Sequence, residues 1–199
     1  SVVEQLLANP LQVELGGRLQ EVTVMFADLG NFTSLAEHTP PEQLLSLLNS
    51  YHGLVVGIVM EHGGTIDKFL GDGLMVLFNT PLEQDDHIER AVQAALGVRA
   101  ALPDFHAKFE ASQRLTINFG IHTGMAVVGN VGTSEIMDFT AVGDTVNVAS
   151  RLQSLSGNNQ ILISGAVYDR IADHTTVNQI GEVNIKGRVE PILVYEVLE

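Results

Sequence analysis

The order of the apolar patterns constrains the fold of this chain more than any other feature. A β-forming run at residues 22–28 precedes a long helical pattern, two β-forming runs around a Gly-Asp-Gly turn, a second helical pattern and further strands. This strand–helix–strand–strand–helix–strand order is typical of ferredoxin-like folds, in which helices cover one face of a mainly antiparallel sheet. We expect an α+β sandwich with a βαββαβ core and a C-terminal extension.

The boundaries of the elements follow from proline, glycine and hydrophobic periodicity. The first long helix is expected to begin near Thr39, where two prolines fit its first turn, and to end before the glycines at 63–64. The second is expected over residues 85–110, with Pro103 kinking or breaking it. A third helix is predicted after Gly143, with Asp144 as its cap, and a short one near 166–172. Further strands are predicted at 115–124, 126–131, 136–142, near 161, at 177–185 and at 192–197.

The first 20 residues differ in pattern from the rest of the chain. Apolar residues at helical spacing precede Pro10 and the glycines at 16–17, which predicts the end of a connecting helix and a linker. The domain proper is then expected over residues 21–199. Because the first residue is Ser1, we expect a piece of a longer protein with an N-terminal regulatory domain.

Composition excludes several classes of protein. At 199 residues and 45% hydrophobic content, the chain suits one domain with a substantial core. It has no cysteine, which excludes disulfides and thiolate metal sites and favours the reducing cytoplasm. No apolar run approaches a membrane span, so we expect no direct membrane contact. A net charge of −14 argues against a nucleic-acid partner and means that an anionic ligand needs local positive charge.

Two acidic residues end β-forming runs. Asp28 closes the run at 22–28, and Asp72 lies in the turn between the runs at 65–70 and 74–78. If the three strands are neighbours, both carboxylates lie at one edge of the sheet, where two divalent metals can bridge them and hold a polyphosphate. The alternative is that Asp28 caps a helix and Asp72 is a turn residue, since Asp favours both positions.

The segment 138–151 carries the strongest local signal. Asn147 and Arg151 are four residues apart on a predicted helix, and therefore on one face. An arginine there can neutralise charge on a phosphoryl group, and an asparagine can hold a ribose by hydrogen bonds. Spacing alone favours the alternative that both residues lie on a solvated helix face.

Three motifs together resemble the class III nucleotide cyclase catalytic domain over residues 21–199. They are FADLGNFT at 26–33, DKFLGDG at 67–73 and GDTVNVASRL at 143–152, in the order and spacing of that family. The resemblance implies attack of the ribose 3′-hydroxyl of a nucleoside triphosphate on its own α-phosphorus, which yields a 3′,5′-cyclic nucleotide and pyrophosphate.

The resemblance also assigns roles at the metal and phosphate sites. It implies that two divalent ions, Mg²⁺ or Mn²⁺, are bound by Asp28, Asp72 and the backbone carbonyl of Leu29. Asn147 then orients the ribose and Arg151 stabilises the transition state, each supplied across a homodimer interface to the metal site of the other chain. The residues it places around the phosphates are Phe32, Thr33, Gly71, Lys186 and Arg188, of which Arg188 is favoured over Lys186 for the terminal phosphates.

Base recognition falls on Lys68 and Thr140 in this resemblance. A lysine with a threonine is the pattern of an adenylate cyclase subgroup, several of whose members respond to bicarbonate, so ATP is the expected substrate. The sequence departs from the family at two positions. Asn31 replaces a usual glycine, and Thr140 replaces the aspartate of many members.

Two other functions are weighed against an active cyclase. A degenerate cyclase fold that only binds nucleotide or mediates dimerisation would be expected to lack one of the key residues, and none is missing. A nucleotidyltransferase or diguanylate-forming palm domain would carry a Gly-Gly-Asp/Glu-Glu-Phe turn, which residues 71–73 do not match.

Overall fold

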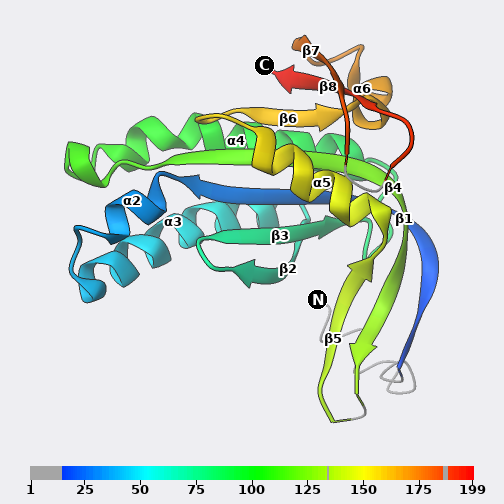
Figure 1. Cartoon of the computed structure of the whole chain (residues 1–199), viewed down its shortest axis with the longest axis horizontal. Coiled ribbons are helices and arrows are strands. Elements are labelled where there is room, and N and C mark those ends of the chain that lie inside the picture. Colours follow the sequence, from blue (N-terminus) through cyan, green and yellow to red (C-terminus); the bar gives the residue numbers. More distant parts are fainter. Residues whose placement is uncertain (1–14, 134, 186–187) are drawn as a thin grey trace.

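A single mixed sheet organises the protein (Figure 1). The computed structural model describes residues 15–133, 135–185 and 188–199. Neighbouring strands follow the order β2-β3-β1-β4-β6-β8-β7, and β5 pairs with β4. The elements are β1 (Gly16–Gly30), α2 (Phe32–Ala36), α3 (Pro41–Glu61), β2 (Thr65–Leu70), β3 (Gly73–Phe78), α4 (His87–His106), the 3₁₀ turn η2 (Ala111–Gln113), β4 (Thr116–Gly132), β5 (Met137–Val142), α5 (Asp144–Leu155), β6 (Ile161–Ser164), α6 (Gly165–Ile171), β7 (Val177–Val183) and β8 (Ile192–Val197).

The predicted α+β fold with a βαββαβ core is confirmed. Strand β3 lies between β1 and β2 and is antiparallel to both, so β1 and β2 run parallel with β3 inserted between them. Their carboxyl ends therefore lie at the same edge of the sheet. The later strands β6, β8 and β7 extend the sheet beyond β4 as the expected C-terminal extension.

Two boundaries differ from the prediction. Strand β4 is one continuous strand through Gly124, where two strands were expected. A Cβ at Gly124 would lie 3.0 Å from Thr145 Oγ1 of α5, so this glycine makes room for a helix and does not form a turn. Strand β1 begins at Gly16, which pairs with Asn130, so the sheet includes residues 16–20 that were expected in the linker. The expected connecting helix at residues 1–14 lies outside the described residues.

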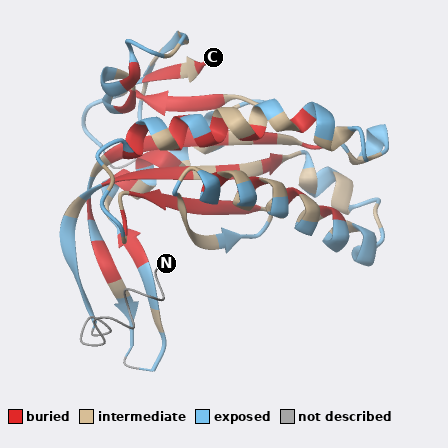
Figure 2. Ribbon diagram, turned by 180° about the vertical axis from the view of Figure 1, so that it is seen from behind, coloured by how far each residue is buried: buried red, intermediate tan, exposed pale blue. Residues whose placement is uncertain are grey.

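The alternation of side chains along the strands separates two apolar layers. Met25 and Val76 face the cluster that contains α3 and α4, whereas Val24 and Met75 face the cluster that contains Ala149 of α5. Helices α3 and α4 thus cover one face, as predicted for the core, and α5 covers the other (Figure 1). Figure 2 shows the buried residues of the sheet between these layers.

Both long helices agree with their predicted positions. Helix α4 continues past Pro103 to His106, so this proline lies in the last turn and does not end the helix. Helix α3 is long and apolar enough to cross a membrane by length and composition, a test that core helices also pass. Its stripe of buried residues, Leu47, Tyr51, Val55 and Val59, packs in the main core.

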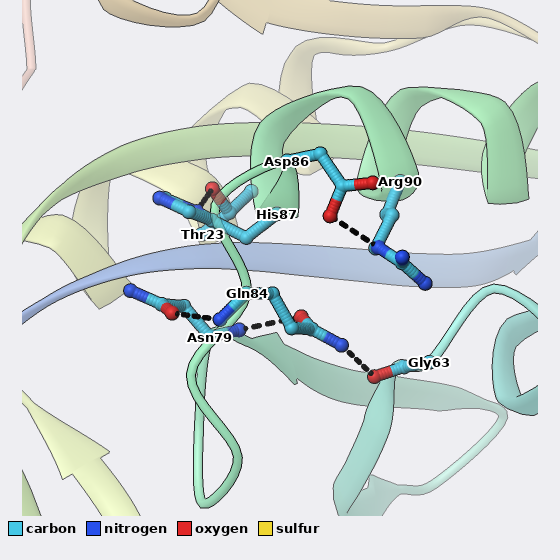
Figure 3. Close-up of polar contacts among 7 residues, drawn as sticks. All are labelled: Thr23, Gly63, Asn79, Gln84, Asp86, His87 and Arg90. Atoms are coloured by element: carbon cyan, nitrogen blue, oxygen red, sulfur yellow. Dashed lines mark hydrogen bonds and ion pairs between the residues drawn. The ribbon is translucent and has the colours of Figure 1, made fainter.

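The loop between β3 and α4 is held by side-chain hydrogen bonds (Figure 3). The backbone N–H of Gln84 donates to Asn79 Oδ1 at 2.6 Å, and the backbone N–H of Asn79 donates to Gln84 Oε1 at 2.9 Å. Gln84 Nε2 also donates to the carbonyl of Gly63 at 2.8 Å. The loop is therefore fixed to the chain that enters β2, which carries the predicted site residue Lys68.

Candidate active site

Asp28 and Asp72 lie at the same edge of the sheet, as the sequence predicts if the three strands are neighbours. The pairing of Ala27 with Leu74 places Asp28 beside Gly73 at the start of β3. A Cβ at Gly73 would lie 2.7 Å from Asp28 Oδ1 and 2.9 Å from the carbonyl oxygen of Ala27. Only glycine leaves room at this position for the Asp28 carboxylate next to Asp72.

The turn that carries Asp72 has two supports. Gly71 has a φ of 67°, a backbone conformation in which glycine is favoured. His52 Nε2 of α3 lies 3.2 Å from the carbonyl oxygen of Asp72, and the His52 ring lies 4.8 Å from the ring of Phe69, centroid to centroid. Sequence analysis did not single out His52, because its helical position has no metal-ligand spacing.

The two carboxylates repel each other. Burial raises the pKa of Asp28, and the negative charge of Asp72 raises it further. The side chain of Gln153 and the backbone N–H of Leu29 donate hydrogen bonds to Asp28 and offset part of the effect. A cation between Asp28 and Asp72 would relieve this cost, so the pair fits a divalent metal.

The ligand set provided by side chains is incomplete, which suits magnesium. Among the residues that the structure describes, no group of three or more His, Asp and Glu residues surrounds one point. Magnesium is commonly held by one or two carboxylates, with water and substrate phosphates completing its octahedral shell. The Asp28–Asp72 pair therefore matches a metal site that a polyphosphate completes.

A polar cleft of about 530 Å³ adjoins the two carboxylates. The loop between β1 and α2 lines part of it, and there Asn31 has a φ of 67° and precedes the first turn of α2. Asparagine tolerates this left-handed conformation, so Asn31 can stand at a position where the family usually has glycine. The lining residues are Asp28, Leu29, Gly30, Asn31, Phe32, Thr33, Ser34, Asp72, Asn118, Gln153, Ser154 and Ser156.

Asn147 and Arg151 lie elsewhere on the chain's surface. Both are exposed on α5, whose opposite side is buried through Val148, Ala149 and Leu152. Neither Asn147 nor Arg151 lines the cleft beside Asp28. Gln153 and Ser154, near the end of the same helix, do line it. We call Asp28, Asp72 and the cleft the metal half-site, and the exposed residues Asn147 and Arg151 the helix half-site.

The structure brings Lys68 and Thr140 together through a third residue. Thr140 Oγ1 donates a hydrogen bond to Asp67 Oδ2 at 3.0 Å, and Lys68 Nζ lies 3.3 Å from the same oxygen. The contact joins β2 to β5, two strands that are not paired with each other. Asp67 was not among the predicted site residues. The sequence feature that could have pointed to Asp67 is its position directly before Lys68 in the second motif.

The predicted phosphate contact at the C-terminal basic segment is occupied by an ion pair. Arg188 Nη1 donates to Asp144 Oδ2 at 2.9 Å. Asp144 was expected to cap α5, but the cap position is Gly143 and Asp144 begins the helix. His122 lies near Arg188. Burial and the positive charge of Arg188 lower the pKa of His122 to about 4, so the His122 ring is neutral at pH 7. Lys186 lies outside the described residues.

Comparison with known proteins identifies the family. The model of the adenylate and guanylate cyclase catalytic domain matches residues 16–198. The chain belongs to this family. Adenylate cyclase 1 of Rhizobium meliloti is 40% identical over 92% of the chain, and an adenylate cyclase of Anabaena cylindrica is 33% identical over 93%. The chain spans only 29% and 38% of the lengths of these two relatives.

Solved cyclase structures share the fold of this cyclase domain. The adenylyl cyclase CyaB from P. aeruginosa superposes with a TM-score of 0.89 and 36% identity, covering 93% of this chain and 97% of that one. The guanylyl cyclase Cya2 superposes with a TM-score of 0.86 and 34% identity, covering 92% and 94%. Because enzymes named for either base are this similar, overall likeness does not decide which nucleotide the domain uses.

Proposed function

We propose that this domain is an adenylate cyclase, which converts ATP to 3′,5′-cyclic AMP and pyrophosphate. The choice of ATP over GTP rests on one observation: Lys68 and Thr140 both contact Asp67, and therefore lie side by side. A lysine ammonium donates to the N1 acceptor of adenine, and a threonine hydroxyl can accept from its 6-amino group, whereas guanine reverses both roles. The sequence similarity to two enzymes named adenylate cyclases supports cyclase activity, and the choice of base rests on Lys68 and Thr140.

The metal half-site is proposed to hold two divalent ions, Mg²⁺ or Mn²⁺. Asp28, Asp72 and the backbone carbonyl of Leu29 are the proposed ligands, and Asp28 and Leu29 line the cleft together. Such ions supply Lewis acidity for the 3′-hydroxyl and the phosphates. Phe32 and Thr33 along the loop are proposed to bind the β- and γ-phosphates, with Gly71 at the neighbouring turn. Lys186 and Arg188, which is paired with Asp144 in the chain alone, are proposed as the basic contacts to the terminal phosphates.

The helix half-site is proposed to act on the metal half-site of a second copy. Asn147 would orient the ribose and Arg151 would stabilise negative charge in the transition state. The separation of Asn147 and Arg151 from the cleft within one chain supports a homodimer. Apolar side chains on the β4–β5 side of the molecule add support, because Met125, Val127, Phe139 and Val142 are 53%, 44%, 38% and 51% exposed.

The proposal also covers the cellular location of the domain and the longer protein to which it belongs. We place the domain in the cytoplasm, where ATP is supplied, within a longer protein that carries an N-terminal regulatory domain. The extra length of the two Rhizobium and Anabaena relatives supports a longer chain. A nucleotide-binding or dimerisation module without activity is the alternative. It is disfavoured because Asp28, Asp72, Asn147 and Arg151 are all present.

The activity is tested by incubating the domain with ATP or GTP and Mg²⁺ or Mn²⁺ and identifying the product by chromatography. We expect cyclic AMP from ATP, no product when EDTA removes the metal, and turnover of GTP slower by at least about tenfold. Asp72→Asn serves as the matched inactive control. Nucleotide binding without cyclic product under both metals would favour the binding module, and faster turnover of GTP would reverse the proposed base.

Bicarbonate activation is a further part of this proposal, motivated by the Lys68 and Thr140 pairing alone. Any effect must come from a local basic pocket, because the chain carries a net charge of −14. We expect a higher turnover in sodium bicarbonate than in equimolar sodium chloride, at fixed pH and ionic strength and saturating metal and ATP. Identical rates across the millimolar range would remove this part and leave the cyclase proposal unchanged.

A further inference from the structure

Asp67 is a buried carboxylate that the proposed chemistry does not use directly. Its side chain has 0% exposure, although Lys68 beside it is 39% exposed. It lies where β2 is irregular, since the pairing with β3 shifts between Ile66 and Lys68. Its Oδ2 accepts the hydrogen bond of Thr140, and its Oδ1 is buried with no hydrogen-bond partner among the described residues. Burying a carboxylate with one free oxygen is costly, so its presence calls for a physical reason.

The direction of the hydrogen bond supplies that reason. An ionised carboxylate can only accept, so the single proton of the Thr140 hydroxyl is directed to Asp67 Oδ2. The Thr140 oxygen then has only lone pairs to offer to another partner. Burial raises the pKa of Asp67, but the hydrogen bond from Thr140 and the Lys68 ammonium, 3.3 Å from Asp67 Oδ2, both act in the opposite direction and favour the ionised carboxylate on which this polarity depends.

We propose that Asp67 is a specificity-determining positioning residue, which fixes the Thr140 hydroxyl as a hydrogen-bond acceptor and holds Lys68 beside it. The 6-amino group of adenine can donate a hydrogen bond to this acceptor. The 6-oxo group of guanine is itself an acceptor, so its lone pairs would face the lone pairs of the Thr140 oxygen. Without Asp67 the hydroxyl is free to rotate and donate. The inference rests on the proposed cyclase function. It explains how threonine, whose hydroxyl can both donate and accept a hydrogen bond, selects one purine.

The hydrogen bond is present before any nucleotide arrives. It connects residues 73 positions apart in the sequence and holds β5 against β2 in the chain alone. Thr140 is only 7% exposed, which limits competition from water for its hydroxyl. An acceptor oriented in advance discriminates better than one that must reorganise, because the wrong base leaves a buried polar group unpaired.

The test is a double-mutant cycle on base selectivity. The ratio of kcat/KM for ATP to that for GTP is measured for the parent, Asp67→Ala, Thr140→Val and the double variant. We expect Asp67→Ala to lower the ratio by about tenfold, mainly through faster use of GTP. In the Thr140→Val background, which has no hydroxyl to orient, the same change is expected to leave the ratio unaltered. A purely structural role would lower both rates together.

Two results overturn the inference. One is an unchanged ratio in Asp67→Ala, and the other is an equal fall in both Thr140 backgrounds. If Asp67→Ala does not fold, Asp67→Asn keeps the shape and is run through the same cycle, because its amide can donate to the hydroxyl and release the proton of Thr140. If the parent makes no cyclic nucleotide, the proposed function fails, and equilibrium affinities for ATP and GTP analogues then replace kcat/KM as the readout for Asp67.

Discussion

Asp28→Ala and Arg151→Ala are each expected to reduce cyclase activity by at least about 10²-fold, and an equimolar mixture of the two is expected to recover activity. Asp28 belongs to the metal half-site and Arg151 to the helix half-site, and within one chain Arg151 does not line the cleft beside Asp28. If the sites are shared in a two-fold dimer, a heterodimer contains one doubly damaged site and one intact site. With random assortment, the mixture should reach about a quarter of the parent activity per chain.

The matched control mixes two variants of the same half-site. Asp28→Ala and Asp72→Ala should not complement, because every metal half-site in such a dimer lacks one carboxylate. Product formation is measured after subunit exchange has been demonstrated with differently tagged chains. Failure of the Asp28→Ala and Arg151→Ala mixture to recover, despite exchange, would contradict shared sites.

Gly73→Ala is expected to abolish most of the activity although it removes no proposed metal ligand or catalytic side chain. The added Cβ would lie 2.7 Å from Asp28 Oδ1 and 2.9 Å from the carbonyl oxygen of Ala27. The carboxylate can swing aside, but the backbone oxygen cannot, so the edge that holds Asp28 and Asp72 must shift. Since small misplacements of catalytic groups cost about 10²-fold, we expect a loss of that order and a higher Mg²⁺ concentration for half-maximal rate.

Gly53→Ala is the matched control for this substitution. A Cβ at Gly53 meets nothing within 4 Å, and alanine is favoured over glycine inside a helix such as α3. This variant should keep full activity and an unchanged metal requirement. Thermal unfolding of both variants is recorded alongside the metal titration. Parent-like metal dependence in folded Gly73→Ala would show that the close approach of Asp28 to β3 is not needed.

The positions of the strand ends were predictable because they depend on local patterns. Apolar runs followed by Asp28 and by the turn at Asp72 predicted carboxylates at strand ends, and the parallel arrangement of β1 and β2 placed them at one edge. The spacing of Asn147 and Arg151 likewise predicted one exposed helix face. These features involve residues that are close in the chain, where periodicity and turn preferences act.

Other features escaped prediction because they join residues that are far apart in the chain. Gly124 was taken as a break between strands, yet it makes space for Thr145 of α5. Residues 16–20 were taken as linker, yet they pair with the far end of β4. Asp144 was taken as a cap, yet it pairs with Arg188, 44 residues away. A glycine or a charged residue looks the same in the sequence whether its partner is local or distant.

Short-range periodicity and composition were enough to predict the βαββαβ core, the family motifs and the residue types available for chemistry. Which of those residues share a site could be seen only in the folded chain. There, Asn147 and Arg151 do not line the cleft beside Asp28, and buried Asp67 contacts both Lys68 and Thr140. Strand order and sheet packing set the distances between segments, and no local pattern carries that information.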